Sequence, residues 1–247
     1  MKSIRFRMLV TLALSATGCT VAGCALPSQT QGQHGGTTVM LVGLWARETN
    51  DQHATTLGCA RETIAWAAKE GSELVIAPVG LPGEEQWITA NFALQTSAQR
   101  TNPFAAKRWQ GKQRSVAENG LMTMERQASQ EESLDLLAAA TDGSRLLNYR
   151  RGPRVLILCA SAQQVSPEFT IGNAPMSQHA IQRALYSLES KLEPMRLTRV
   201  VFGAAGDAEQ TGQSFTEQAT HEAFWRAWAH HEGAIHFAWG PIPHFPY

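Results

Sequence analysis

Residues 37–46 read TTVMLVGLWA, and residues 153–160 read PRVLILCA. Both runs are apolar almost without interruption, which is typical of strands that are buried on both faces of a parallel sheet. Residues 86–96 (QWITANFALQT) alternate more loosely and predict a strand at a sheet edge. Three further strands are predicted by shorter apolar runs: ELVIAPVG (73–80), LTRVVFG (197–203) and AIHFAW (234–239).

Helical patterns fill most of the intervals between these runs. The first predicted helix carries an apolar stripe that includes Leu57, Ile64 and Ala68, and we expect Asn50 or Asp51 to cap it. Further helices are predicted over residues 101–129, 131–147, 181–192 and 214–231. Strands that alternate with helices predict an α/β fold, a three-layer, doubly wound and mostly parallel sheet with helices on both faces, in one domain.

The composition limits the classes of function. Hydrophobic residues make up 43% of the 247 residues, which is enough for a sizeable core. Lys+Arg and Asp+Glu both number 21, so the net charge is zero, and we expect no electrostatic attraction to nucleic acid or to an anionic membrane surface. Residues 203–206 (GAAG) lack both a dinucleotide fingerprint and a P-loop lysine, so no cofactor is predicted.

The N-terminal segment predicts where the protein resides. Lys2, Arg5 and Arg7 precede the apolar run Met8–Ala16, which is too short to span a bilayer and is typical of a cleaved signal peptide. The sequence VAGC (21–24) then resembles the lipobox of bacterial lipoproteins. In that family the cysteine is diacylated and the chain is cut before it, which implies a signal peptide over residues 1–23 and lipid attachment at Cys24.

Such a lipid would anchor the protein to a bilayer. The polar stretch ALPSQTQGQHGG (25–36) would be a flexible tether to the domain at 37–247. Ala25 follows the cysteine where retained Gram-negative lipoproteins have Asp, so the resemblance implies no signal for retention at the inner membrane. We expect the protein on the outer side of the cytoplasmic membrane or on the outer membrane. Two alternatives are cleavage of an ordinary secretory signal near Ala25 and acylation at Cys19.

Cys59 and Cys159 are the cysteines beyond the signal region. An oxidising compartment would allow them to form a disulfide. They lie in different predicted elements, however, and Cys59 falls on the helix face opposite the apolar stripe of Leu57 and Ile64. We therefore expect two unpaired, packed thiols, with a disulfide as the alternative.

The order of predicted elements resembles a von Willebrand factor A-type domain over residues 37–240. The segments that carry the resemblance are SLDLLAA (133–139), RVLILC (154–159) and FWRAW (224–228). This family implies the doubly wound fold predicted above. Its members bind a divalent cation through an Asp-x-Ser-x-Ser loop after the first strand, a distant Thr and an Asp after the fourth strand.

The residues of that metal site are not present in this chain. Gly43 stands at the position of the first aspartate, and Trp45 and Arg47 fall at about the serine positions. Ser133 or Leu134 occupies the threonine position, and the fourth strand is followed by Ser161 and Ala162 without a carboxylate. A hard cation requires oxygen ligands, so we predict no metal at this position.

The carboxyl ends of the strands remain the predicted functional region, because ligands of doubly wound folds bind there. The residues expected at this edge are Trp45, Arg47, Glu48, Ser161, Gln163, Gln164 and Asp207. An exposed Trp beside an Arg has the character of an interface anchor, which predicts a protein-binding surface. The alternative is structural: Trp45 would pack beneath its loop, and Arg47 would pair with Glu48 or Asp51.

Other candidate sites carry less weight. His230 and His231 are adjacent on a predicted helix and diverge, so they do not converge with His236 and His244 on one zinc ion. Ser161 lies outside any G-x-S-x-G motif. We expect a non-enzymatic envelope lipoprotein that binds an unknown envelope protein. The alternative is an α/β hydrolytic enzyme that uses Asp207 or histidines at the strand ends.

Overall fold

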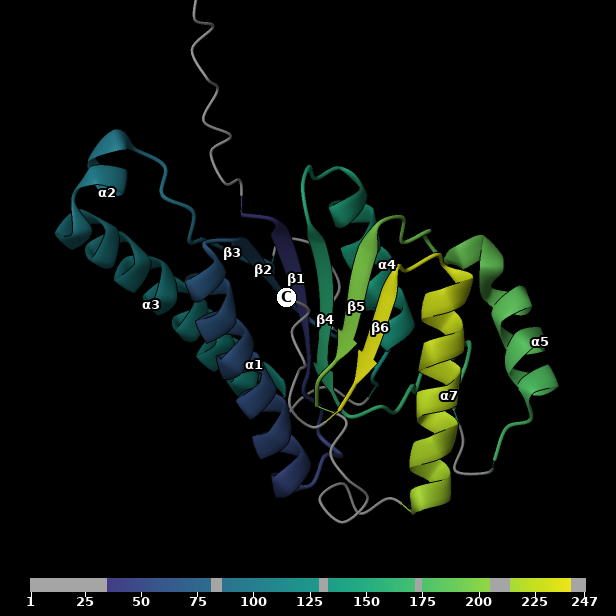
Figure 1. The fold of residues 1–247 in the computed structure, drawn as a ribbon. Coiled ribbons are helices and arrows are strands. Elements are labelled where there is room, and N and C mark those ends of the chain that lie inside the picture. Colours follow the sequence, from purple (N-terminus) through teal and green to yellow (C-terminus); the bar gives the residue numbers. More distant parts are fainter. Residues whose placement is uncertain (1–34, 81–85, 129–132, 172–174, 205–213, 241–247) are drawn as a thin grey trace, which may run out of the picture. The chain divides into compact units, whose positions relative to one another are not determined.

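The predicted strands form one six-stranded sheet in the computed structural model of the chain (Figure 1). The structure describes residues 35–80, 86–128, 133–171, 175–204 and 214–240. The strands are β1 (Thr37–Gly43), β2 (Glu73–Pro78), β3 (Ile88–Asn91), β4 (Arg154–Ala160), β5 (Thr198–Phe202) and β6 (His236–Trp239). Their order is β3-β2-β1-β4-β5-β6. All neighbours are parallel except β3, which runs antiparallel to β2 at the edge.

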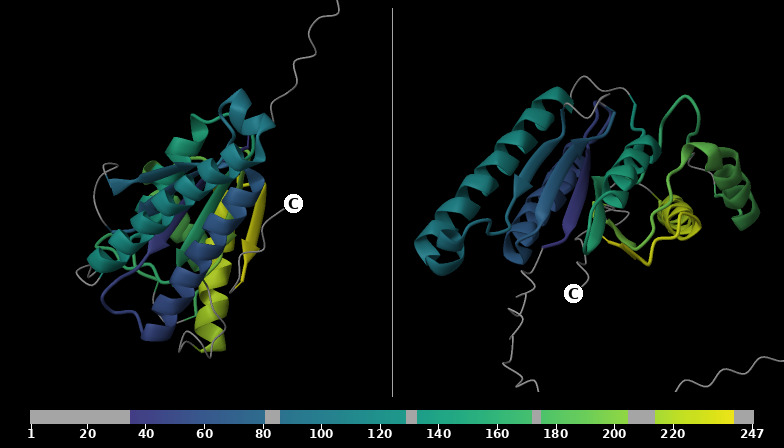
Figure 2. Two further views of the ribbon diagram at one scale, coloured as in Figure 1. Left: turned by 90° about the vertical axis from the view of Figure 1, so that its left-hand side faces the viewer. Right: turned by 90° about the horizontal axis from the view of Figure 1, so that it is seen from above.

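Helices cover both faces of this sheet, which confirms the predicted doubly wound α/β fold (Figure 2). One face packs against α1 (Asn50–Glu70) and α3 (Pro103–Ala128), and the other against α4 (Leu136–Asn148), α5 (Gln178–Leu188) and α7 (Phe215–His231). The short α2 (Ser97–Thr101) precedes α3, and a 3₁₀ turn, Glu189–Lys191, follows α5. No helix among the described residues is both long and apolar enough to cross a membrane.

The two apolar runs that predict the fold lie side by side at the centre. β1 pairs with β2 on one side and with β4 on the other, and Val39, Leu41, Leu156 and Leu158 face one helical layer. Met40, Val42, Ile157 and Cys159 alternate with them and face the other layer. Because both faces are covered, successive residues along each strand are buried and the runs are continuously apolar.

Some predicted boundaries differ from the structure. Helix α4 begins at Leu136, capped by Asp135, and not near residue 131. The segment that follows β4 contains isolated bridges from Val165 to Leu134 and to Thr170. The signal segment, the tether up to residue 34, Asp207 and the tail at 241–247 lie outside the described residues.

Strand order changes direction between β1 and β4. The chain moves outward to β2 and β3 after β1, and outward in the opposite direction to β5 and β6 after β4. In open α/β sheets, ligands bind outside the carboxyl ends of the strands at such a switch point. The connections that follow Gly43 and Ala160 therefore form the candidate site.

Candidate functional site

The connection from β1 to α1 begins with a β-turn. The N–H of Glu48 donates to the carbonyl of Trp45 at 3.2 Å, so Ala46 and Arg47 occupy the tip of the turn and are exposed. The side chains at the two ends of the turn point inward: Trp45 is 7% exposed, and the side chain of Glu48 is 1% exposed. The turn therefore displays Arg47 between two buried residues.

The next residue fixes the start of α1. Thr49 is the N-cap, its hydroxyl accepts from the N–H of Gln52 at 3.2 Å, and its own N–H donates to the side-chain oxygen of Gln52 at 3.0 Å. This reciprocal capping box satisfies two backbone donors. The prediction of Asn50 or Asp51 as the cap is wrong, because both already belong to the helix.

The side chain of Arg47 faces the solvent at the tip of this turn. It makes no ion pair or side-chain hydrogen bond with the described residues, so the predicted pairing with Glu48 or Asp51 is wrong. The prediction of Trp45 as an exposed anchor is also wrong, since its ring belongs to the apolar cluster on the α4 and α7 side of the sheet. The alternative interpretation, in which Trp45 packs beneath its loop, is confirmed.

Glu48 is a buried carboxyl group at the switch point. No described group meets hydrogen-bond geometry at either of its oxygens, and the Ser161 hydroxyl is likewise buried without a described partner. Burial raises the pKa of Glu48 from 4.5 to about 8. The Trp45 backbone and then the hydroxyl and backbone of Ser161 approach the carboxyl and lower this pKa in part. At neutral pH the group is therefore mostly a neutral carboxylic acid.

A histidine connects this buried acid to the surface. His53 Nδ1 lies 3.8 Å from Glu48 Oε2, and His53 Nε2 lies 3.7 Å from Glu125 Oε1 on α3. The imidazole and Glu125 are both partly exposed, whereas the Glu48 side chain is not. The imidazole of His53, on α1, therefore lies between two carboxyl groups: that of Glu125 on α3 and that of Glu48 in the turn.

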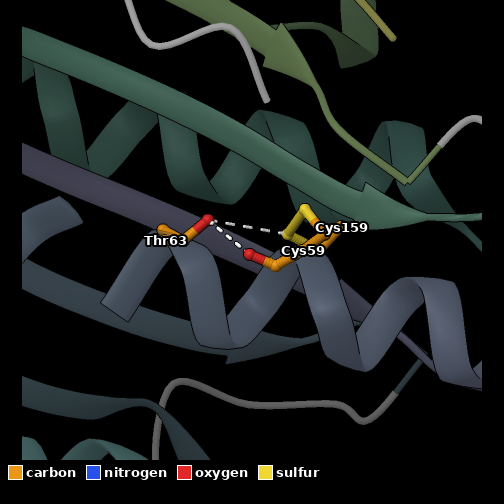
Figure 3. The surroundings of a disulfide bond; sticks show 3 residues. All are labelled: Cys59, Thr63 and Cys159. Carbon is orange, nitrogen blue, oxygen red and sulfur yellow. Dashed lines mark hydrogen bonds between the residues drawn. A yellow bond between two sulfur atoms is a disulfide. The ribbon is translucent and has the colours of Figure 1, made fainter. Parts of the chain in front are cut away.

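A disulfide joins α1 to β4, so the prediction of two unpaired thiols is wrong. Cys59 and Cys159 are bonded, with Cα atoms 5.6 Å apart, and the Thr63 hydroxyl lies 3.8 Å from Cys159 Sγ (Figure 3). The prediction failed because α1 packs against both the sheet and α3, which buries more of the helix than one apolar stripe. Cys59 belongs to that wider face, together with Thr56 and Thr63.

The segment after β4 is held by its own hydrogen bonds. The buried Gln164 accepts from the N–H of Leu137 at 3.1 Å and donates to Asp135 Oδ1 at 2.8 Å. Trp225 Nε1 donates to the carbonyl of Ala162 at 2.9 Å. Gln163 is half-buried. Gln164 therefore fixes the start of α4 and is not part of a binding surface.

Gly43 lies in a tightly packed position at the end of β1. A Cβ atom at this position would lie 2.6 Å from the Ala160 Cβ and 2.9 Å from Leu134 Cδ1. Contacts this short leave no room for an aspartate side chain. Among the described residues, no three His, Cys, Asp or Glu side chains are grouped so that they could hold a metal ion.

Two hollows lie away from the turn. One, of about 270 Å³, is lined mainly by α4 and the segment after β4. Four of its charged residues form the pairs Arg145–Asp142 (2.8 Å) and Lys191–Glu168 (2.7 Å), and a fifth, Asp135, accepts from Gln164. The other, of about 690 Å³, lies between α5 and α7, where Arg226 pairs with Glu222 at 2.6 Å. Trp45, Arg47, Glu48 and Ser161, which the sequence predicts as site residues, line neither hollow.

A second buried ionisable group lies on α7 and is not among the residues that the sequence predicts. His221 is 1% exposed, and both ring nitrogens are buried without a described hydrogen-bond partner. Burial lowers its pKa, and the nearby Glu217 raises it to a smaller extent. Its helical spacing from Trp225 and Trp228 places it on the buried face of α7, which is the pattern that could have identified it.

Comparisons with known proteins give no relative from which a function could be proposed, so the proposal below is based on the sequence and the geometry of the site. No family model matches the chain, and no match was found among curated proteins or among solved structures.

Proposed function

We propose that this chain is a lipid-anchored protein of the bacterial cell envelope whose α/β domain binds another envelope protein through the turn that carries Arg47. The observation that carries the binding proposal is Arg47 itself. It is exposed, has no described partner, and sits at the switch point on a turn whose flanking side chains are buried. An arginine presented in this way is a frequent energetic centre of protein interfaces, and it favours an acidic partner surface.

The disulfide supports the envelope location. Cys59 and Cys159 are separated by 100 residues and are both buried. Disulfides of this structural kind persist in oxidising compartments and are rare in the cytosol. This agrees with the signal segment and lipobox in the sequence, from which we propose lipid attachment at Cys24 and exposure on the outer side of the cytoplasmic membrane or on the outer membrane.

The resemblance to a von Willebrand factor A-type domain forms part of the same proposal. An antiparallel edge strand β3 and the helical excursion of α2 and α3 precede α4 and β4, in the order on which the resemblance rests. The contact of Gly43 with Ala160 supports a metal-free version of this domain. Recognition would then depend on direct contact with Arg47 and not on a cation bridge.

Site-specific photo-crosslinking in cells tests the proposal. A crosslinking residue at Ala46, on the tip of the turn, should capture one envelope protein, and Arg47→Glu should abolish the adduct without lowering the melting temperature. The matched control places the crosslinker at Tyr186, which is exposed on α5. Equal capture from both positions, or capture that survives Arg47→Glu, would exclude this turn as the binding surface.

A hydrolytic enzyme is the second candidate. The observation in its favour is the proximity of Glu48, with its raised pKa, to the Ser161 hydroxyl at a switch point. Hydrolysis of ester substrates that is lost in Glu48→Gln but retained in Arg47→Ala would favour the enzyme over the binding protein.

A further inference from the structure

The segment Ser97–Arg114, here called the α2–α3 arm, extends beyond the sheet. Its links to the sheet region are at its C-terminal part: the side chain of Gln113 accepts from the N–H of Asn91 at 2.9 Å, and Trp109 Nε1 donates to the carbonyl of Ala93 at 3.1 Å. α2 and the first turns of α3 lie past the end of β3 (Figure 1). The arm therefore presents a surface that packs against little of the domain.

The charge of this arm is strongly positive. Residues 86–117 contain no Asp or Glu, whereas the chain as a whole has equal numbers of acidic and basic residues. The exposed basic side chains of the arm are Arg100, Lys107, Arg108, Lys112 and Arg114. None of them forms an ion pair with a described residue. The net charge of the protein is zero, but its charges are unevenly distributed, and the arm forms a local basic surface.

An exposed aromatic side chain lies within this basic surface. Phe104 is 77% exposed, and Lys107 and Arg108 follow it at spacings of three and four residues, so all three share one side of α3. Arg108 and Lys112 are also four residues apart, a spacing at which like charges destabilise a helix. An anionic, partly apolar surface would relieve both the repulsion and the exposure of the ring.

The arm lies at the edge of the sheet where the chain enters the domain. Thr37, the first residue of β1, is in register with Glu73, and Glu73 is in register with Asn91 at the end of β3. Asn91 precedes the arm by six positions. The exposed Arg151 and Arg196 precede β4 and β5 at this same edge. The start of β1 and the basic arm therefore share one end of the domain, opposite to the Arg47 turn.

We propose that the α2–α3 arm lies on the anionic surface of a lipid bilayer, with Phe104 in the interfacial layer and the basic residues on lipid phosphates. The choice of a membrane as the binding partner rests on the lipid anchoring proposed above. The affinity of the arm for an anionic surface does not depend on the lipid anchor. Basic helices with an aromatic apolar side bind anionic interfaces in this way. The contact would orient the domain so that the Arg47 turn faces away from the membrane.

Vesicle co-sedimentation tests the contact without the lipid anchor. The protein is the chain from residue 24 with Cys24→Ser, which cannot be acylated and contains the whole compact unit His34–Tyr247. It is mixed with vesicles of phosphatidylcholine, with or without one-third phosphatidylglycerol. We expect binding to the anionic vesicles alone, and a loss of binding as salt is raised, because exposed charges are screened.

Matched variants locate the contact. Each basic residue near an anionic surface contributes about a fivefold factor in affinity, so Lys107→Gln with Arg108→Gln should weaken binding on the order of 25-fold. Arg61→Gln with Arg183→Gln, exposed positions on α1 and α5 outside the arm, should change it by less than about threefold. Phe104→Ser should weaken binding about tenfold, whereas Phe215→Ser, equally exposed at 77% on α7, should not.

Several results would overturn this proposal. The protein would fail to bind anionic vesicles, or would bind vesicles of phosphatidylcholine alone equally well. The arm variants and the control variants would lose the same amount of vesicle affinity, or duplex DNA would displace the protein from vesicles at a lower concentration than free lipid does. Failure of lipid anchoring would be seen separately, as the absence of an acylated N-terminus, and would leave the vesicle result unchanged.

Discussion

Replacing Glu48 by glutamine should make the stability of this protein less dependent on pH. The carboxyl group is buried beside Ser161, without a hydrogen-bond partner among the described residues, and its pKa is about 8 in the folded protein against 4.5 when exposed. The folded state thus holds a proton that the unfolded chain releases from about pH 4.5 upward. A neutral glutamine of similar shape has no proton to lose.

The magnitude follows from proton linkage. Below pH 4.5 the group is protonated in both states and contributes no pH dependence. Between pH 4.5 and 8 the folded state alone binds the proton, so the free energy of unfolding falls with rising pH by about 1.4 kcal/mol per unit. Above pH 8 the loss levels off, at about 4 to 5 kcal/mol for the whole interval, which is an upper bound for a buried group.

Urea denaturation of the wild type and Glu48→Gln, at closely spaced pH values under oxidising conditions, measures this effect. The two proteins should be similar near pH 4, and the variant should become progressively more stable than the wild type up to pH 8. Glu62→Gln, an exposed position on α1, is the matched control and should parallel the wild type. The difference between variant and wild type removes contributions from other titrating groups.

Two outcomes would refute the reasoning. A stability difference that is constant from pH 4 to 8 would mean that Glu48 titrates near 4.5 and is not effectively buried. A variant that becomes less stable than the wild type as pH rises would mean that the ionised carboxylate is stabilised, as by a bound cation or by protonated His53.

The other predictions concern the disulfide, His221 and Gly43. Replacing both Cys59 and Cys159 by alanine should lower the free energy of unfolding by about 4 kcal/mol, because the bond closes a loop of 100 residues; unfolding curves with and without reductant check this, and an unchanged midpoint would contradict it. His221→Gln should gain stability relative to the wild type as pH falls below 6.5, since burial lowers the histidine pKa and the folded state resists protonation; thermal melts at pH 5 and 7.5 measure it, and a pH-independent difference would oppose it. Gly43→Ala should cost about 1 to 3 kcal/mol through contact with Ala160 and Leu134, whereas a neutral effect in urea denaturation would show that the strands can separate there.

The strands are predictable from the sequence because a short, unbroken apolar run between helical patterns is typical of a strand buried on both faces. Thr37–Gly43 and Arg154–Ala160 lie centrally and are covered on both sides, so nearly every residue in them is buried. Helix starts are harder to predict. Thr49, Asn50 and Asp51 are all residue types that can cap a helix, and the turn before α1 decides which side chain accepts from a backbone N–H.

The candidate site is predictable in position but not in orientation. Trp45, Arg47 and Glu48 do follow β1 at the switch point, yet a single β-turn sends the first and third inward and the second outward. A charged residue in a loop is usually solvated, so the sequence pattern does not indicate burial of Glu48. The pairing of Cys59 with Cys159 depends on how widely α1 is buried, which an apolar stripe alone does not reveal.

The mass of the mature protein, isolated with its lipid from a bacterial host, tests the central claim most directly. Our account predicts a chain that starts at Cys24, carries acyl groups on that residue, and contains one disulfide between Cys59 and Cys159. An unmodified chain that starts at Ala25 or retains residues 1–23 would contradict the lipid-anchored envelope protein proposed here.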